Sequence, residues 1–576
     1  MNILVLLLFL AISSGLPAAP QSHPLTGTWE KFSMKDDKGA DMPSADKGTL
    51  LIITTDGYYA QIEIPKNRKF IERELGELTK EDLLNRFKGL IARFGTYRIV
   101  GDKLVRSDMS HSDPSSEGFE QVQAFRVEGD VLILTNPVPN DKSEIQFRRM
   151  KAATETPADP AKVEWLAKNQ VPLQSIDPSD VNFEDLMPLK KCIGSARVVM
   201  LGEQSHGDGA TFDAKTRLIR FLHEQMGFNV LAFESGLYDC EAGNRMLGEG
   251  KPIAEILISS IFGIWARGEK LVPLFNYLAA TAKSKRPLAL SGFDIQFSAF
   301  NQKRTAADFL AELTAGLAAI DQGLADEETQ KLLSRLTPGI ADPASKPTKE
   351  ERESDLRRLK ELLDGVVTGS AQKSSRDNDF TIRLLHNLVA LTQLELIYLK
   401  EGPDSRAWDS TNLRDRNMAE NIVWLLEERY KGEKIIVWAA SMHIARDAAK
   451  IDSRLRSISY ADCRSMGQGV WDVLKDQMYA IAFTAYDGAC GPPGYARALA
   501  PASEASLEGL LHATGMPLSF LDFRALPADS WLRQPLLSRP LGYATMLAAW
   551  PLHFDAMLYT ETMYPNPLRA DWKKPD

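Results

Sequence analysis

The sequence predicts an α/β protein whose mostly parallel sheet carries helices on both faces and a helical insertion, preceded by a small antiparallel β-barrel-like domain. Three observations lead to this fold class. Short strands joined by two-residue turns extend to residue 150, a polar proline-containing stretch follows, and strands and helices then alternate. Such alternation is typical of parallel sheets, because parallel neighbours need crossover helices.

A secretory signal peptide is predicted at residues 1–19. Ile3 to Ile12 is an apolar run too short to cross a bilayer, and small residues follow it up to Ala19. Pro20 argues against cleavage directly after Ala19, so we expect cleavage at Ala18 or slightly earlier. No later apolar stretch reaches the length of a membrane span, and the sequence therefore predicts a secreted or periplasmic protein.

Export permits disulfides, and the chain has four cysteines, at positions 192, 240, 463 and 490. Three complete pairings are possible, and the sequence does not choose among them. Cys463 and Cys490 lie closest in the chain, so they are the first expectation for a bridge. The spacings do not fit a zinc knuckle.

Residues 24–150 are predicted to form the β domain. Asp56-Gly57, Gly101-Asp102 and Gly129-Asp130 each separate two β-rich segments, which is typical of antiparallel hairpins. The paired segments are Leu50 to Thr54 with Tyr58 to Ile64, Gly95 to Val100 with Lys103 to Arg106, and Gln121 to Val127 with Val131 to Thr135. A meander of these hairpins can close into a barrel, which removes exposed sheet edges.

The opening segment Leu25-Thr26-Gly27-Thr28-Trp29 is similar to the start of lipocalin-like domains, in which a tryptophan closes the barrel floor. This resemblance implies an apolar ligand inside the barrel. A tryptophan that only packs on the first strand of some other β domain fits the motif equally well. The sequence leaves both interpretations open.

Residues 151–160, with Thr-Glu-Thr-Pro-Ala-Asp-Pro, are predicted to be a linker, and residues 161–570 an α/β domain. Arg197 to Leu201 and Asn229 to Phe233 have the apolar character of buried strands. Between them, Thr211 to Met226 has one apolar helical stripe and ends at Gly227, which completes a βαβ unit. Further strands are predicted at Pro287 to Phe293, Lys434 to Ala439, Met478 to Thr484 and His553 to Tyr559, and a helix at Leu413 to Tyr430.

Residues 299–402 interrupt this alternation with charged, helix-forming sequence that has no strand signal. We interpret the segment as a helical insertion packed over one end of the sheet, where it could act as a lid or substrate wall. A bundle that only buries its own apolar stripe fits the pattern equally well.

The composition of the chain excludes several classes of protein. Its 576 residues are 44% hydrophobic and 25% charged, as in ordinary globular proteins, so extensive disorder is excluded. Its 68 basic and 77 acidic residues give a net charge of -9, without the basic excess that nucleic acid requires. The expected partner is a small molecule that is neutral or cationic.

Chemically active residues follow four of the predicted strands: Glu203 and His206 after the first, then Glu234, Asp294 and His443. Ligands bind outside the carboxyl ends of strands in open parallel sheets. Two histidines and several carboxylates at one edge suit general acid–base chemistry, because a neutral imidazole accepts a proton from water and a carboxylate fixes its tautomer. The pattern therefore predicts a catalytic or ligand-binding cleft at this edge.

This constellation resembles the erythromycin esterase family, hydrolases first known for opening the lactone ring of macrolide antibiotics. The matching pieces span about residues 160 to 570 and are Gly202-Glu203-Gln204-Ser205-His206-Gly207, Gly227-Phe228, Phe233-Glu234, Trp265 with Glu269, Gly292-Phe293-Asp294, Arg414-Asp415, Met418-Ala419, Asn421, Trp438 to His443, Ser465-Met466-Gly467 and Phe554-Asp555-Ala556. The resemblance implies an α/β fold with helical insertions. It also implies hydrolysis of an ester or lactone by a histidine-activated water, with neither a metal nor a cofactor.

Carried over residue by residue, the resemblance implies that His206 is the general base and that Glu203 and Glu234 orient it or the substrate. His443 would be the second catalytic histidine, which protonates the leaving alkoxide or holds the oxyanion. Substrate-binding roles are implied for Arg414, Asp294, Trp265, Glu269 and Lys215. A solvated helix face would explain Lys215 and Arg217 equally well. The antibiotic-resistance enzymes lack the amino-terminal β domain, which leaves the natural substrate open.

Two other functions remain open on the sequence. A metal-dependent hydrolase could use the same Glu and His side chains as ligands, and chelation would then abolish its activity. A non-catalytic protein could instead bind a small molecule in the β barrel and keep the α/β domain as a scaffold. Deletion of residues 20–155 would then remove ligand binding, whereas a change at His206 would not.

Overall fold

The structure is a computed structural model that describes residues 23–42, 47–65, 89–113, 117–118, 120–150, 156–299, 302–337, 347–370, 375–401, 408–452 and 460–572. The chain divides into two compact units, Met1–Thr154 and Glu155–Asp576. The predicted signal peptide lies outside the described residues, and the predicted linker is described only from residue 156. Within the described residues, no helix has the length and apolar character needed to cross a membrane.

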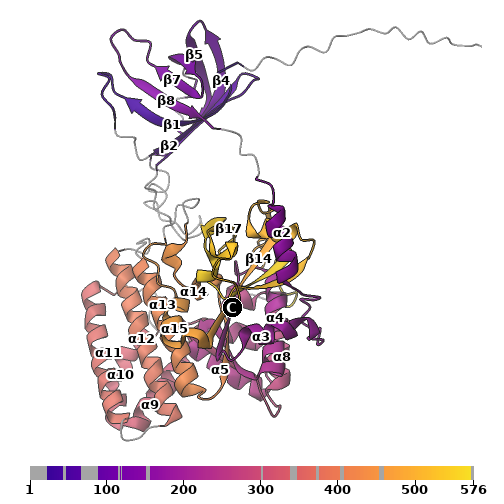
Figure 1. The fold of residues 1–576 in the computed structure, drawn as a ribbon. Helices are drawn as coiled ribbons and strands as arrows, with labels where there is room; N and C mark the ends of the chain where they lie inside the picture. The colour runs from indigo at the N-terminus through magenta and orange to yellow at the C-terminus, as the bar shows by residue number, and fades with distance from the viewer. Residues whose placement is uncertain are drawn as a thin grey trace, which may run out of the picture. The chain divides into compact units, whose positions relative to one another are not determined.

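The first unit is a closed barrel of antiparallel strands (Figure 1). Its strands are β1 (Gly27–Lys35), β2 (Lys47–Ile53), β3 (Tyr58–Pro65), β4 (Ile91–Val100), β5 (Lys103–His111), β6 (Glu120–Glu128), β7 (Val131–Thr135) and β8 (Glu144–Arg149). Each strand pairs with the next in the chain, and β8 closes the barrel on β1. The three predicted hairpins are confirmed as β2–β3, β4–β5 and β6–β7.

Trp29 is fully buried in the apolar core of the barrel. Its indole Nε1–H donates to the carbonyl oxygen of Leu25 at 2.9 Å, and the Arg149 guanidinium lies 4.0 Å from its ring centroid. The tryptophan thereby joins Leu25, β1 and β8. Leu51, Phe147 and other buried side chains of the barrel complete the same core.

The second unit is built on a mixed sheet in the order β12-β11-β13-β10-β14-β19-β16-β9, with β15 paired to β14. Its strands are β9 (Val171–Pro172), β10 (Val198–Leu201), β11 (Phe228–Gly236), β12 (Ala289–Asp294), β13 (Lys434–Trp438), β14 (Met478–Cys490), β15 (Arg497–Leu499), β16 (Leu518–Asp522) and β19 (Ala556–Met563). The six strands from β12 to β19 are parallel. β16 is antiparallel to β19, and the short β17 (Leu536–Ser538) and β18 (Met546–Ala548) form a separate pair.

Alternate residues of the central strands pack into two different cores, so the sheet is buried on both faces. Val198 and Met200 of β10 belong to one core, whereas Val199 and Leu201 belong to the other. Continuous apolar runs are expected of strands that are covered on both faces. This burial explains why the parallel strands could be predicted from apolar runs alone.

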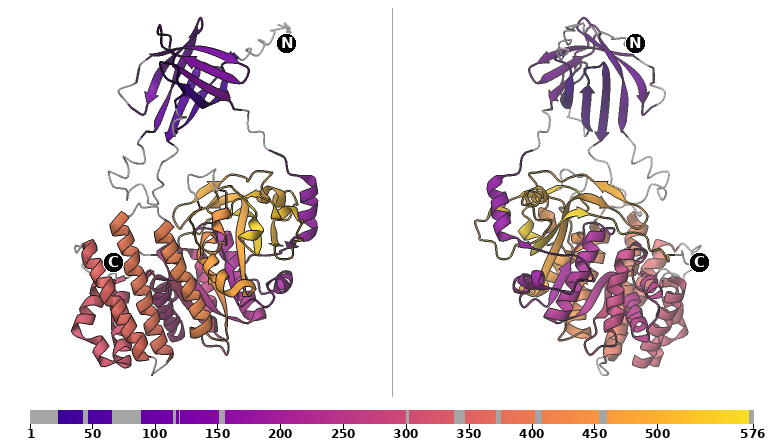
Figure 2. Two further views of the ribbon diagram at one scale, coloured as in Figure 1. Left: turned by 60° about the vertical axis from the view of Figure 1, so that its left-hand side comes forward. Right: turned by 90° about the vertical axis from the view of Figure 1, so that its right-hand side faces the viewer.

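Helices of the second unit cover the sheet (Figures 1 and 2). They are α2 (Pro160–Asn169), α3 (Met187–Ile193), α4 (Gly209–Met226), α5 (Leu237–Glu249), α6 (Ile253–Ser260), α7 (Gly263–Ala266), α8 (Val272–Thr281), α13 (Trp408–Trp424), α14 (Ser441–Ile444), α15 (Met466–Leu474) and α16 (Leu507–His512). Residues of α3, α4, α6 and α8 pack into one core, and residues of α13 and α15 into the other. Gly227 ends α4 with φ of 73°, the left-handed conformation that favours glycine at this position.

The predicted helical insertion consists of α9 (Gln302–Ile320), α10 (Glu327–Leu336), α11 (Lys349–Ser370) and α12 (Arg376–Glu401). Figures 1 and 2 show these helices side by side as a bundle next to the sheet. Leucines of all four helices join the same core as α13 and α15. The insertion is therefore continuous with the core of the second unit.

The expected bridge between Cys463 and Cys490 is wrong, because all four cysteines are free thiols. Cys463 is buried in the large core with α13 and α15, whereas Cys490 ends β14 in a small cluster with Ala210 and Met563. The Cys490 sulfur accepts a hydrogen bond from Arg497 Nε at 3.3 Å. The two cysteines are close in the chain, but the residues between them form α15 and β14, and these elements place the two thiols in different clusters.

We expect Trp29→Ala to lower the free energy of unfolding of the barrel by about 3–5 kcal/mol, because it leaves a cavity and an unpaired Leu25 carbonyl. Chemical denaturation followed by far-UV circular dichroism measures the change. Phe94→Ala is the matched control, since Phe94 is 50% exposed and its loss should cost about 0.5 kcal/mol or less. Equal effects of the two changes would contradict a core role for Trp29.

Candidate active site

Four neighbouring strands bring the predicted polar residues to one edge of the sheet. β13 lies between β11 and β10, and β12 lies outside β11. Glu203 follows β10, Glu234 lies near the end of β11, Asp294 ends β12 and His443 follows β13 on α14. The carboxyl ends of parallel strands share an edge, so residues separated by up to 240 positions become neighbours.

Glu203 is a buried carboxylate that binds three donors. Its Oε2 accepts from Lys215 Nζ at 2.8 Å. Its Oε1 accepts from Trp265 Nε1 at 2.8 Å and lies 2.9 Å from His206 Nδ1. Lys215 also donates to the carbonyl oxygen of Ala439 at 3.3 Å, and this contact links α4 to the end of β13. The carboxylate charge of Glu203 is therefore balanced, and one of its oxygens is available to orient the His206 ring.

His206 is the most exposed histidine of the cluster. Its side chain is 39% exposed, compared with 13% for His443. The ring packs edge-on against Trp265, with centroids 4.8 Å apart. When Nδ1–H donates to Glu203, the other ring nitrogen of a neutral His206 carries a lone pair that can accept a proton.

The turn that carries His206 is held by close backbone packing. Ser205 donates to the buried Asp208 through its backbone N–H and through its hydroxyl, both at 2.7 Å. A Cβ added at Gly207 would lie 1.9 Å from backbone atoms of Gly491, so a larger residue cannot occupy this position without moving the turn. The position of His206 is therefore set by the loop that follows β14 as well as by β10.

His443 lies between two carboxylates. Its Nδ1 is 2.8 Å from Asp415 and its Nε2 is 3.2 Å from Glu234. Asp415, on α13, also accepts from the backbone N–H of Met466 at 2.9 Å. Glu234 uses its second oxygen to accept from the backbone N–H of Ala440 at 2.8 Å. Both ring nitrogens of His443 therefore face acceptors, which favours the doubly protonated imidazolium.

Arg414 completes the cluster from α13. Its guanidinium makes three contacts with the Asp294 carboxylate, at 2.5 to 3.2 Å, and one with Glu234 at 3.3 Å. It also lies 3.4 Å from His443 Nε2. Asp294 is buried, and this ion pair holds the Arg414 guanidinium in place.

Neighbouring charges set the protonation of the two histidines. Burial alone would lower the pKa of His443, but Asp415 and Glu234 raise it to about 10. Burial also opposes protonation of His206, yet its hydrogen bond and charge interaction with Glu203 raise its pKa above the ordinary value. Burial raises the pKa of Glu234 less than His443 and Arg414 lower it, so its pKa falls well below its usual range. At neutral pH His443 is cationic and Glu234 is ionised.

Not every residue predicted for the site joins it. Glu269 begins a short turn after α7 and its side chain is exposed, away from the contacts described above. The solvated-face interpretation of Lys215 and Arg217 is wrong, since both side chains are buried. Lys215 pairs with Glu203, whereas Arg217 binds Asp185 at 2.7 Å on the other side of α4.

Two residues of the site had no role in the sequence prediction. Asp415 directly follows Arg414 in the chain, and this adjacency is the feature of the sequence that could have indicated its role. Asp208 lies in the turn after His206 and binds Ser205. Burial raises the pKa of Asp208 to about 7 against the opposing hydrogen bonds from Ser205.

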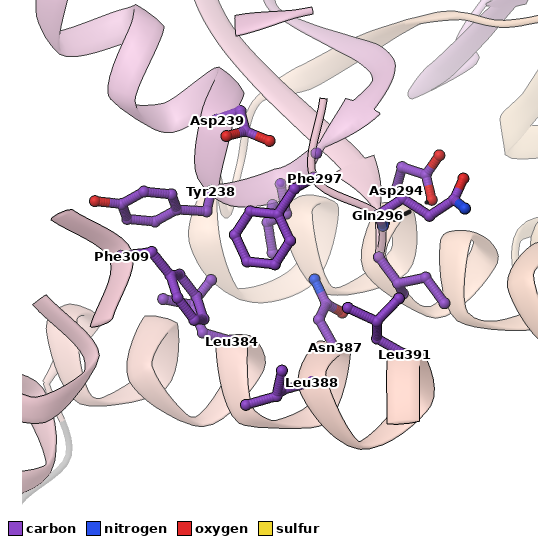
Figure 3. A pocket seen from close by; sticks show the side chains of 13 residues that line it. Tyr238, Asp239, Asp294, Gln296, Phe297, Phe309, Leu384, Asn387, Leu388 and Leu391 are labelled. Carbon is purple, nitrogen blue, oxygen red and sulfur yellow. Dashed lines mark hydrogen bonds between the residues drawn. The ribbon is translucent and has the colours of Figure 1, made fainter. Parts of the chain in front are cut away.

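A pocket lies beside Asp294, where the helical insertion meets the sheet edge (Figure 3). Phe309 of α9 and Leu384, Leu388 and Leu391 of α12 form its apolar wall. Residues that follow β11 and β12 complete the lining. This contact agrees with the predicted position of the insertion over one end of the sheet.

No group of three or more His, Cys, Asp or Glu side chains is arranged to hold a metal ion within the part of the chain that the structure describes. The histidines and carboxylates of the cluster are instead paired with each other, with Arg414 and with Lys215.

A sequence profile of the erythromycin esterase family matches residues 223–563. The chain belongs to the erythromycin esterase family. Among curated relatives of this family member, a putative hydrolase named YbfO from Bacillus subtilis is 27% identical over 420 residues, 70% of this chain and 91% of the relative. Erythromycin esterase type II from Escherichia coli is 27% identical over 395 residues, 64% of this chain and 90% of the relative.

Solved structures share the fold of this erythromycin esterase family member. A Bacillus cereus protein superposes with a TM-score of 0.59 at 19% identity, covering 71% of this chain and 98% of that one. A succinoglycan biosynthesis protein gives 0.53 at 20% identity, with the same coverage. A mutant of the erythromycin esterase EreC in its open conformation gives 0.50 at 18% identity, covering 68% of this chain and 97% of that one.

We expect Lys215→Met to destabilise the second unit by about 3–5 kcal/mol, because it leaves the buried Glu203 carboxylate without its cationic partner. Thermal and chemical denaturation measure the loss. Lys168→Met is the control, since Lys168 forms an exposed ion pair with Glu164 and its removal should leave the stability nearly unchanged. A Lys215→Met protein as stable as the control would show that the buried pair does not hold this edge together.

Proposed function

We propose that this protein is an exported hydrolase that cleaves a carboxylic ester or lactone with a water molecule activated by His206. One observation carries the proposal. The His206 ring is partly exposed, and its Nδ1 lies 2.9 Å from the buried carboxylate of Glu203. That arrangement leaves Nε2 free to act as a base. Export is proposed on the apolar run from Ile3 to Ile12.

In the proposed reaction, Nε2 of neutral His206 takes a proton from water as the water oxygen attacks the carbonyl carbon. Glu203 stabilises the imidazolium that forms, because the ring then donates to a carboxylate whose position Lys215 and Trp265 hold fixed. The carbonyl oxygen gains the negative charge of the tetrahedral intermediate. Collapse of the intermediate breaks the bond to the alkoxide, and His206 returns its proton to that leaving group.

We propose that His443 and Arg414 supply the positive charge that stabilises the oxyanion. The two cations lie 3.4 Å apart and are held by Asp415, Glu234 and Asp294. Groups fixed before the reaction need no reorganisation when the charge develops, and this makes them effective in a site shielded from water. The same charge distribution suits a neutral substrate such as an ester.

We expect His206→Ala and His443→Ala each to reduce turnover of the best substrate by at least about 1000-fold, since they remove the base and the oxyanion charge. The purified mature protein is assayed against simple esters, lactones and macrolides, with and without a chelator. Glu269→Gln is the matched control, because Glu269 is exposed and makes none of the cluster contacts, so it should keep full activity.

The outcomes of this assay separate the alternatives. Activity that survives chelation and disappears in both histidine variants supports the proposed mechanism. Activity lost on chelation and restored by a divalent ion would favour a metal-dependent hydrolase. Full activity of His206→Ala would rule out its role as the base, provided circular dichroism shows that the variant is folded.

The value of kcat/KM should follow a bell-shaped curve with pH. The rate should rise with pH through the pKa of His206, which lies above 6.5, because only neutral imidazole accepts the proton. It should fall as pH passes about 10, because His443 then loses the proton that gives its charge. Steady-state rates across this pH range measure both limbs.

Asp415→Asn provides the internal control for this profile. Removing the Asp415 charge should lower the pKa of His443, so the alkaline limb should move to lower pH while the acid limb stays in place. An alkaline limb that does not move would contradict its assignment to His443.

A further inference from the structure

We propose that the barrel of the first unit contains a binding site for a small organic carboxylate, formed by Arg106 and Arg93. These arginines belong to the first unit, whereas the cluster around His206 belongs to the second. It also differs from the apolar ligand that the lipocalin-like opening of the sequence implied.

Arg106 lies on β5 with its side chain inside the barrel and is 2% exposed. Within the described part of the barrel its guanidinium donates to neutral amide oxygens alone, at 2.7 Å to Gln61, 3.1 Å to Gln121 and 2.5 Å to Gln123. It also lies 5.3 Å from the ring centroid of Tyr59. Its buried Nε–H has no hydrogen-bond partner.

A second guanidinium shares one of these acceptors. Arg93, opposite Gln61 on the neighbouring strand, donates to the Gln61 side-chain oxygen at 2.9 Å. Two cations therefore meet at a single amide oxygen. The Nε–H of Arg93 is likewise buried and unpartnered, so the interior presents two unused charged donors close together.

The carboxylates around these arginines do not pair with them. Among the residues that the structure describes, no ion pair joins Arg106 or Arg93 to a carboxylate. Glu63 accepts instead from the side-chain nitrogen of Gln61 at 2.8 Å, and Asp108 is hydrogen-bonded to the Tyr59 hydroxyl. Burial lowers the pKa of Arg106 to about 9, and the charge of Arg93 lowers it further against the pull of Glu63.

A buried guanidinium without a counter-charge is costly, and unpaired buried N–H groups add to that cost. A bound anion would offset both penalties. A carboxylate fits best, because its two oxygens match the planar donors of guanidinium groups. The core around Trp29 is packed from apolar side chains, so the site is formed by the unpaired Nε–H groups of Arg106 and Arg93.

Binding of hexanoate to the full chain tests this proposal, with hexanamide as a neutral probe of nearly the same shape. We expect isothermal titration calorimetry to give one saturable site for hexanoate, with hexanamide at least about 10-fold weaker. Arg106→Met should weaken hexanoate binding at least about 10-fold. His206→Ala should leave it unchanged, because the catalytic cluster lies in the other unit.

Two further variants keep the test decisive. Arg98→Met is the matched control, since Arg98 also lies on a barrel strand but is 57% exposed and ion-paired with Glu120, so binding should not change. Arg93→Met should weaken binding even if Arg106→Met fails to fold. The proposal would be overturned by equal binding of hexanoate and hexanamide, or by the absence of saturable hexanoate binding. Full hexanoate binding by a folded Arg93→Met protein would also overturn it. So would saturable binding of inorganic phosphate in place of hexanoate.

Discussion

Glu203 and Lys215 are both removed from water, and the 2.8 Å ion pair between them lies next to the His206 ring. Neither charge would be tolerated at this depth alone, so each fixes the position of the other. Through Trp265 and the Ala439 carbonyl, the pair also joins α7, α4 and the end of β13. The position of the His206 ring is therefore set by α7, α4 and the end of β13, and the rest of the polar cluster is arranged around this contact.

The charges of the edge nearly balance. Four carboxylates, those of Glu203, Glu234, Asp294 and Asp415, face three cations when His443 is protonated, namely Lys215, Arg414 and His443. One negative charge remains. A proton on His206 cancels it, and Glu203 favours that proton, because its hydrogen bond and its charge raise the pKa of the ring against the effect of burial. The cluster is thus tuned to accept one proton and to hold it next to a carboxylate.

Much of this architecture could be predicted from local sequence patterns, and the failures have physical causes. Turn glycines and apolar runs revealed most of the barrel strands and the six parallel strands, because those patterns report burial and backbone conformation directly. The strand β8, with the sequence Glu-Ile-Gln-Phe-Arg-Arg, was not predicted, because its charged side chains mask the alternation. The burial of Lys215 and the role of Asp415 depend on partners more than 10 positions away in the chain, and local patterns carry no information about them.

The order of strands in the sheet has a consequence for how the protein is made. β10 and β11 are consecutive in the chain but are not neighbours in the sheet, because β13 lies between them. A growing chain that ends before Lys434 carries His206 and Glu234 but cannot join the two strands that bear them. Pairing must wait until the helical insertion has been synthesised, and such long-range contacts slow folding. The chain therefore cannot assemble this polar edge during early synthesis, and the cluster forms only when the sheet of the second unit is complete.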